Sequence, residues 1–324
     1  MDQTAPPNHP SFFQVTDADA DARLDIFLAR RLSVGRTQVR KLLTAGQVSL
    51  NGRTVSESAK GLPVRAGATI NVSGFVPSDE MIVIPRPDLP LTILNGGAGW
   101  IAVDKPAGMA VHPLDVTQAD TLLNAAVARY PQIQGIGEAG LRSGVVHRLD
   151  VDTSGALLLA LTQETWDALR SAFAQHRAHK TYLALVHGAL RGEGRETMDL
   201  LISQHHPARV RVLRRPASPA QRDSTKGARR CNLSWKSLEH FGDTASLVEV
   251  TLGTGFLHQI RVMLAELGHP VIGDKTYGRN DALNAPRHML HALRVTAAGA
   301  AAESPIPSDF QLLLNTLRVR SDQR

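Results

Sequence analysis

Residues 147–155 bring together several side chains that could do chemistry. The segment contains one His, one Arg, two Asp, two hydroxyl residues and one Gly, and apolar runs flank it on both sides. Reactive groups on a loop that strands hold in place are a common arrangement in active sites. An ordinary turn would use the same residue types, with Asp152 and Thr153 bonding to the backbone and Gly155 adopting a positive φ. The residues alone leave both interpretations open.

Three other chemistries for this segment each lack a required group. Residues 152–155 resemble an aspartic-protease loop, but Ser154 interrupts the pattern and no second copy supplies a partner carboxylate. A metal site on His147 and Asp150 lacks a third ligand at a recognisable spacing. Ser154 also lacks the context of a nucleophile elbow. The sequence therefore predicts no metal site and no hydrolase of these types.

The segments around this loop predict an α+β domain with a largely antiparallel sheet. The expected strands are residues 100–103, 145–146, 156–161, 181–186 and 246–252. The expected helices are residues 121–130 with Thr121 as the cap, 164–175 and 259–267. Because strands and helices do not alternate strictly, a doubly wound parallel sheet is not expected.

A smaller unit is expected at residues 21–75. Apolar residues at helical spacing predict two short helices, one with Leu24, Phe27, Leu28 and Leu32 and one with Val39, Leu42 and Leu43. Asn51-Gly52 is a strong signal for a hairpin. The expected strands are residues 48–50, 53–55 and 68–72.

Positive charge is concentrated in two segments. The whole chain has a net charge of +6, from 36 basic and 30 acidic residues. Residues 23–72 contain nine basic and two acidic side chains, and residues 205–230 contain eight basic and one acidic side chain. The rest of the chain therefore has a net negative charge. Two Arg-rich patches on an acidic body are typical of a protein that binds a polyanion. On the second short helix, Arg36 and Arg40 share a face, with Lys41 beside them.

The domain prediction is a flexible tail at residues 1–20, the small unit at 21–75, a linker at 76–90 and the larger domain at 91–324. Four prolines between Pro77 and Pro90 indicate the linker. A single cysteine excludes a disulfide framework and favours a reducing, cytoplasmic location. The sequence shows neither a signal peptide nor an apolar run long enough to span a membrane.

Several segments resemble the RluA/RluD-type pseudouridine synthase family. Residues 147–155 match its signature, H-R-L-D-x-x-T-S-G, at every fixed position. Further matching segments follow in the family's order: residues 104–108 with 111–113, 180–182, 258–261, 273–274, 277–278 and 290–292. Residues 21–75 separately resemble the αL-type RNA-binding module named after a small-subunit ribosomal protein. The resemblance covers nearly all of residues 21–315.

This resemblance implies a role for each matching residue. Asp150 corresponds to the catalytic aspartate, Arg261 to its cationic partner and Tyr182 to the residue that contacts the uracil. The residues expected to bind the substrate are Arg148, which would fill the space left by the extruded uridine, Ile260, His258 and Gln259. The residues expected to bind RNA from the small unit are Arg36, Arg40, Lys41 and Arg53. No redox step or group transfer occurs, so no cofactor is expected.

The chain departs from the family pattern at two places. Phe256 and Leu257 stand where the family usually has Arg-Thr, so an RNA-facing pair has become apolar. The usual His-Pro stretch near the C-terminus is replaced by residues 297–302, and we expect the last strands to be trimmed there.

The sequence thus predicts a monomeric, cytoplasmic RNA pseudouridine synthase with no membrane association. Large-subunit ribosomal RNA is the expected substrate, with transfer RNA as the other candidate. The alternative from another class is a non-catalytic RNA-binding or ribosome-assembly protein on the same fold. An altered Asp150 or Arg261 would favour that alternative, and both are intact.

Overall fold

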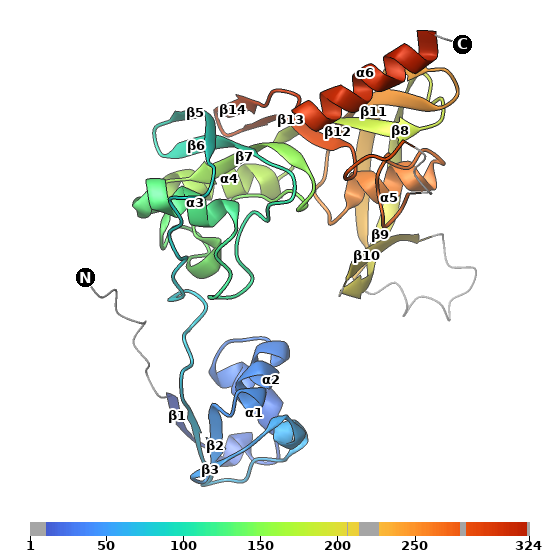
Figure 1. Cartoon of the computed structure of the whole chain (residues 1–324). Helices are drawn as coiled ribbons and strands as arrows, with labels where there is room; N and C mark the ends of the chain where they lie inside the picture. Colours follow the sequence, from blue (N-terminus) through green and yellow to red (C-terminus); the bar gives the residue numbers. More distant parts are fainter. Residues whose placement is uncertain (1–10, 206, 214–226, 279–282, 323–324) are drawn as a thin grey trace. The chain divides into compact units, whose positions relative to one another are not determined.

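The computed structural model describes residues 11–205, 207–213, 227–278 and 283–322 (Figure 1). Contacts divide the chain into two units. The N-terminal unit is Met1–Ile82 with Ala139–Leu141, and the large unit is Val83–Glu138 with Arg142–Arg324. Within the described residues, no helix is both long and apolar enough to cross a membrane.

The N-terminal unit packs two short helices on a small antiparallel sheet. Its helices are η1 (Asp17–Asp19), α1 (Leu24–Arg31), α2 (Arg36–Thr44) and η2 (Glu57–Gly61), and its strands are β1 (Ser11–Gln14), β2 (Val48–Leu50), β3 (Arg53–Thr54) and β4 (Thr69–Val72). The strand order is β1-β4-β2-β3. Asn51 and Gly52 both have positive φ, +48° and +78°, as a tight hairpin turn requires. The two helices and the hairpin agree with the sequence-based prediction.

Two expected boundaries differ in the structure. Residues 11–14 form β1, which pairs with β4, so this part of the expected flexible tail belongs to the sheet; residues 1–10 lie outside the described residues. The second half of the expected linker packs on the large unit. Val83 is 1% exposed, and its backbone N–H and C=O both bond to the Gln134 side-chain amide. The buried Val83 side chain and these two backbone hydrogen bonds therefore anchor this stretch to the large unit.

The described residues of the large unit form one sheet of ten strands. Their order is β10-β9-β11-β12-β8-β13-β7-β6-β5, with β14 paired to β13. The strands are β5 (Thr92–Gly97), β6 (Trp100–Lys105), β7 (Ser154–Ala160), β8 (His179–His187), β9 (Glu193–His205), β10 (Ala208–Leu213), β11 (Arg229–Phe241), β12 (Ala245–Leu252), β13 (Leu290–Ala297) and β14 (Ala300–Glu303). The β13–β7 pair is parallel and the other pairs among the described strands are antiparallel. This architecture agrees with the predicted α+β class.

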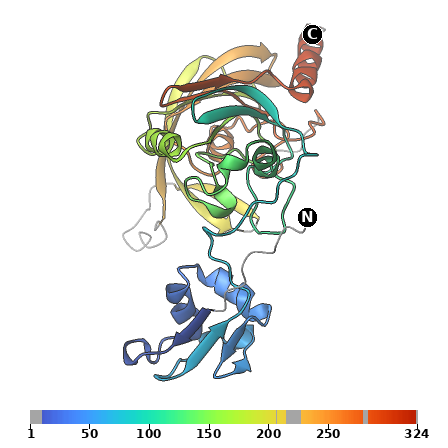
Figure 2. The same ribbon diagram turned by 90° about the vertical axis from the view of Figure 1, so that its left-hand side faces the viewer.

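Helices cover both faces of this sheet. The helices of the large unit are α3 (Leu122–Arg129), η3 (Pro131–Ile133), α4 (Gln163–Ala174), α5 (Gln259–Glu266) and α6 (Ser308–Asp322), while η4 (Gly140–Arg142) spans the boundary between the two units. Side chains of α5 pack with Tyr182 and Ala184 of β8, whereas those of α6 pack with Leu183 and Leu185. Because successive strand residues point to opposite faces, α5 and α6 lie on opposite sides. Figure 2 shows the curved sheet with α5 on its inner side and α6 on its outer side.

Several elements of the large unit differ from the expectation. Residues 145–146 form only an isolated bridge, from Val145 to Leu159, instead of a strand. At residues 297–302, where we expect trimmed strands, Ala298 and Gly299 turn the chain with positive φ between the paired strands β13 and β14. The helix cap at Thr121 is confirmed, and Asn124 completes a capping box. The sequence analysis gave no ranges for β5, β9, β10, β11, β13, β14 and α6.

Candidate active site

The 147–155 loop is tied to the turn that follows β6. The Val151 carbonyl accepts from the Gly108 N–H at 2.9 Å and from Lys105 Nζ at 2.8 Å. Lys105 is fully buried and also donates to the carbonyls of Pro106 and Met109. Burial lowers the pKa of this ammonium to about 7. One buried amine therefore links the backbone beside Asp150 to the 106–109 turn.

Arg261 on α5 bridges two carboxylates. Its Nε and Nη2 donate to the two oxygens of Asp274, at 2.7 and 2.9 Å, and its Nη1 donates to Asp150 Oδ2 at 3.0 Å. The Arg261 and Asp274 side chains are 7% and 0% exposed, whereas that of Asp150 is 23% exposed. Asp274 thus anchors the guanidinium inside the protein, and Asp150 is the carboxylate that solvent or substrate can reach.

The charges of this buried pair stabilise each other. Burial works against both charged forms, but the Asp274 carboxylate more than compensates and holds the pKa of Arg261 above its usual value. In the same way, Arg261 and the N–H groups of Thr276 and Tyr277 hold the pKa of Asp274 below its usual value despite burial. Arg261 is therefore a fixed positive charge beside Asp150.

Tyr182 and Ile260 provide the apolar part of the site. Tyr182 on β8 is 7% exposed, and burial together with the Asp150 charge raises the pKa of its phenol. Ile260 lies in the first turn of α5 and is 4% exposed. Tyr182, Ile260 and Leu149 belong to one hydrophobic cluster. A neutral aromatic ring next to an ion pair suits a flat, uncharged base.

A second arginine, which the sequence analysis missed, supports the loop from the C-terminal side. Arg287 donates through Nη1 to the Asp152 carbonyl at 2.9 Å and through Nη2 to Ser154 Oγ at 3.1 Å. Asp309 at the start of α6 binds its Nε at 2.7 Å. In addition, the Thr153 hydroxyl contacts His288 Nε2 at 2.8 Å. These side chains fix the second half of the loop relative to β13 and α6.

Comparisons with known proteins agree with this geometry. The sequence model of the family described as RNA pseudouridylate synthase matches residues 99–266, which is more than half of the chain. This chain belongs to the RNA pseudouridine synthase family. It is therefore an isomerase that acts on RNA, and the non-catalytic alternative is not favoured. An S4 domain model matches residues 22–67, in agreement with the predicted αL-type RNA-binding module.

Relatives cover almost the whole of this RNA pseudouridine synthase. An uncharacterised RNA pseudouridine synthase of Chloroflexus aurantiacus is 36% identical over 92% of this chain and 91% of its own length. A Xanthomonas campestris protein named ribosomal large subunit pseudouridine synthase D is 32% identical over 98% and 96%. The solved structure of human RNA pseudouridylate synthase domain containing 4 aligns with a TM-score of 0.55 at 20% identity, covering 70% of this chain and 93% of that one. The structural likeness shows the shared fold.

Two further members of the signature loop of this pseudouridine synthase have different environments. Arg148 is exposed and has no hydrogen bond or ion pair with the described residues, so it is free to meet a ligand. His147 instead accepts from the Leu158 N–H at 3.0 Å and stacks on Phe173, with ring centroids 4.6 Å apart. Burial lowers the pKa of His147 to about 3. A neutral imidazole bonded to a central strand and stacked on Phe173 is a structural residue.

His258 and Gln259 precede and begin α5, and only one of them is open to a ligand. The sequence predicts a substrate contact for Gln259, whereas the structure shows it 3% exposed with its amide bonded to protein groups. Its Oε1 accepts from Thr254 Oγ1 and the Phe256 N–H, and its Nε2 donates to the Asn232 carbonyl. Gln259 thus fixes the turn before α5. His258 is partly exposed and contacts Tyr277 through Nδ1 at 2.9 Å.

The apolar pair before α5 also has a structural explanation. Phe256 and Leu257 are partly buried and pack against the hydrophobic cluster that contains Tyr182. These two apolar side chains, which replace the family's usual polar pair, therefore enlarge the hydrophobic cluster that contains Tyr182.

Basic side chains are exposed in both units. In the N-terminal unit, considered by itself, the exposed cations include Arg36, Arg40, Lys41 and Arg53. In the large unit, the exposed members of the second basic segment are Arg209, Arg211, Arg229 and Arg230. Arg214, Arg215, Arg222 and Lys226 of that segment lie outside the described residues.

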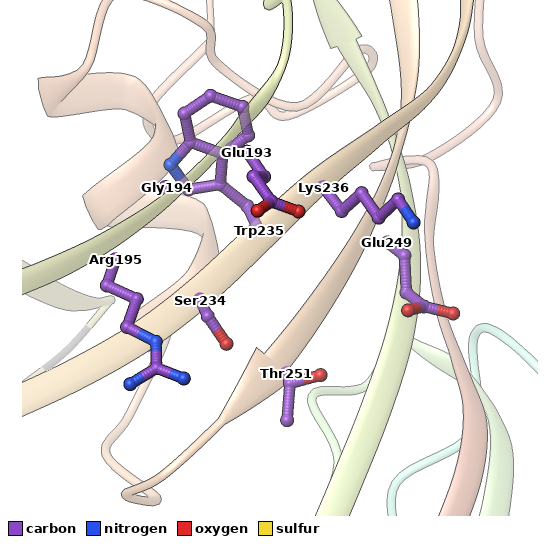
Figure 3. Close-up of a pocket in the computed structure, with 8 residues that line it drawn as sticks. All are labelled: Glu193, Gly194, Arg195, Ser234, Trp235, Lys236, Glu249 and Thr251. Atoms are coloured by element: carbon purple, nitrogen blue, oxygen red, sulfur yellow. The ribbon is translucent and has the colours of Figure 1, made fainter.

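A shallow hollow on the outer face of the sheet is separate from this site (Figure 3). Glu193, Lys236 and Glu249 are among its lining residues, which come from β9, β11 and β12. In the β12–β8 register, Val250 pairs with Tyr182, so the neighbouring Glu249 points to the opposite face. Within the described ranges, no three His, Cys, Asp or Glu side chains lie together as metal ligands would.

Proposed function

We propose that this enzyme converts uridines of large-subunit ribosomal RNA to pseudouridine, with Asp150 as its catalytic carboxylate. The observation that carries this proposal is the Arg261 guanidinium, which Asp274 anchors on one side and which holds Asp150 at 3.0 Å on the other. The reaction breaks the bond between the base and the sugar, turns the uracil and rejoins it through carbon 5. Every atom of the substrate is retained, so a positioned carboxylate and base pocket suffice.

Asp150 can start this reaction by either of two routes. It can attack the anomeric carbon as a nucleophile, or it can remove a proton from the neighbouring sugar carbon as a general base. Both routes need an ionised carboxylate at a fixed position, and Arg261 Nη1 provides the balancing charge and the direction. Lys105 and Arg287 limit the movement of the loop that carries it. Such preorganisation is a large part of the rate enhancement of many enzymes.

The remaining side chains of the site would hold the target nucleotide. Tyr182 and Ile260 would contact the uracil, because both line the apolar cluster next to Asp150. Arg148 would occupy the space that the uridine leaves in the RNA, since it is exposed and has no partner among the described residues. His258 would contact the substrate, and we reassign Gln259 to positioning of the turn before α5.

The RNA around the target would bind to exposed cations of both units. Arg36, Arg40, Lys41 and Arg53 are the residues that we assign to the N-terminal unit. The named relatives of Xanthomonas campestris and Nitrosomonas europaea, both called ribosomal large subunit pseudouridine synthase D, favour ribosomal over transfer RNA. We also propose that the enzyme is a monomer, and a ribosomal RNA substrate favours the cytoplasm.

The test is chemical mapping of pseudouridines in total RNA from cells with and without this protein, followed by complementation with two variants. Asp150→Asn should fail to restore the missing modification and should keep less than about one per cent of the single-turnover rate, because it removes the carboxylate at almost constant volume. Asp152→Asn is the matched control, since its exposed side chain lies two residues away and should be dispensable. Loss of positions only in transfer RNA would contradict the substrate assignment. An active Asp150→Asn protein would contradict the catalytic one.

A further inference from the structure

His258 is held by a chain of hydrogen bonds that begins at the edge of the sheet. β10 is the outermost strand, and the Val210 N–H donates to Tyr277 Oη at 2.8 Å instead of to another strand. Tyr277 Oη in turn lies 2.9 Å from His258 Nδ1. The guanidinium carbon of Arg261 also lies over the Tyr277 ring, 5.3 Å from the ring centroid. Tyr277 therefore contacts both the ion pair and the histidine.

The chemistry of the groups gives these bonds a direction. A backbone N–H can only donate, so Tyr277 Oη accepts from Val210. The phenol proton of Tyr277 remains available, and His258 Nδ1 is the other partner of this oxygen among the described residues. Burial lowers the pKa of His258 and so favours the neutral ring near pH 7, in which one nitrogen carries a proton and the other is able to accept. The arrangement that also gives the phenol proton an acceptor has Nδ1 accepting from Tyr277 and the ring proton on Nε2.

We propose that Tyr277 fixes His258 in the Nε2-protonated tautomer, so that His258 offers a hydrogen-bond donor to an acceptor oxygen of the target nucleotide. In the described part of the chain, His258 Nε2 has no hydrogen-bond partner, and Asp150 is among the charges that act on this ring. Tyr277 is then a positioning residue and His258 a specificity residue. The substrate half of the inference rests on the proposed function, whereas the tautomer half is independent of it.

The test reads the tautomer directly, in the full-length protein without RNA. Nitrogen-15 chemical shifts of imidazoles report which ring nitrogen carries the proton, and the His258 signals are assigned by their loss in His258→Gln. The exposed His179 serves as the reference, through His179→Gln. We expect an unprotonated Nδ1 and a protonated Nε2 in the wild type, and a mixture of tautomers in Tyr277→Phe, which keeps the ring over Arg261. A wild-type protein with the proton on Nδ1 would overturn the proposal, whatever its activity.

The substrate half is tested with the Asp150→Asn protein, which binds without turnover. We expect a short oligouridylate to shift the His258 Nε2 signal and an oligoadenylate to leave it unchanged. This result would place the contact on a uracil carbonyl. An equal response to both places it on a phosphate oxygen, and no response to either overturns this half. In single-turnover assays we expect Tyr277→Phe to be about three- to tenfold slower than wild type. His258→Gln, whose amide nitrogen occupies the Nε2 position, should keep more activity than His258→Asn; the reverse order would contradict a donor at Nε2.

Discussion

Replacing Asp274 by Asn should reveal how far the active site depends on the carboxylate behind Arg261. The Asp274 side chain has no exposed surface, and its oxygens accept from Arg261 Nε at 2.7 Å and Nη2 at 2.9 Å. In Asp274→Asn one of these oxygens becomes an amide NH2, which faces an arginine N–H instead of accepting from it. Breaking a buried pair in this way typically costs about 3–5 kcal/mol. Because Asp150 remains as a second partner, we expect the lower end of this range, about 3 kcal/mol.

A matched pair on the surface serves as the control. Glu239 binds Arg318 with nearly the same geometry, at 2.9 Å from Nε and 2.7 Å from Nη2, but the two side chains are 33% and 44% exposed. Solvent screens such a pair, so Glu239→Gln should lose no more than about 1 kcal/mol. Urea unfolding of both variants at neutral pH measures the difference. Equal losses for the two variants would refute the argument from burial.

The same variant tests the link from Asp274 to catalysis. Without its anchor, Arg261 loses the fixed direction of its Nη1 bond to Asp150. A charge-assisted hydrogen bond contributes about 1.5–3 kcal/mol, so the single-turnover rate should fall roughly 10- to 150-fold. The stability difference from wild type should also shrink in acid. A carboxyl whose folded-state pKa lies below its ordinary value of about 3.9 stabilises the fold above that pH, and this contribution is lost as the pH falls through the folded-state pKa. A destabilised variant that reacts at the wild-type rate would show that Arg261 does not act through Asp150.

Three other perturbations follow from the structure. Charge reversal at Arg36 and Arg40 should weaken RNA binding and reduce the slope of log affinity against log salt by roughly 0.7–0.9 for each lost phosphate contact, without changing the single-turnover rate; an unchanged slope would exclude this helix from the RNA contact. Gly155→Ala should destabilise the protein by more than about 3 kcal/mol, because its Cβ would collide with the β13 backbone, whereas Gly108→Ala, with a positive φ but open space, should lose only about 1–2 kcal/mol in thermal or urea unfolding. Lys105 has a folded-state pKa of about 7 against an ordinary value of about 10.4, so its charged form destabilises the folded state. The unfolding free energy of wild type relative to Lys105→Met should therefore rise as the pH increases from about 7 to 10. A difference that does not change with pH would contradict the lowered pKa.

The sequence was most informative where a local pattern determines the structure. Asn51-Gly52 specifies its turn by the φ angles that these two residues tolerate, and Thr121 specifies a helix start by its hydroxyl. The signature loop was found in the same way, because its residues are contiguous. The apolar face of α6 was also readable from Phe310, Leu313 and Leu317, which recur at helical spacing, but the analysis did not use this signal.

The residues that the sequence did not reveal act through contacts between distant segments. Arg287 supports Asp152 and Ser154 across more than 130 positions of the chain, and no local pattern around it indicates this role. Asp274 lies in a segment that resembles the family, yet its function as the anchor of Arg261 depends on the packing of α5. The long strands β9 and β11 carry polar residues on their outer face, which weakens the apolar signal of a strand.

The position of β13 has a consequence for the order in which the protein can be completed during synthesis. This strand lies between β8 and β7, and it pairs in parallel with β7 only at Ser154 and Gly155, the last two residues of the 147–155 loop. Until Leu290 and the residues after it have left the ribosome, β7 and β8 both have an unpaired edge, and Arg287 has not yet reached the loop. A nascent chain can therefore form the sheet in two separate parts, β5 to β7 and β8 to β12, but it cannot close them. Emergence of β13 is thus the step that allows the two parts to join and covers two sheet edges that would otherwise stay open to other chains.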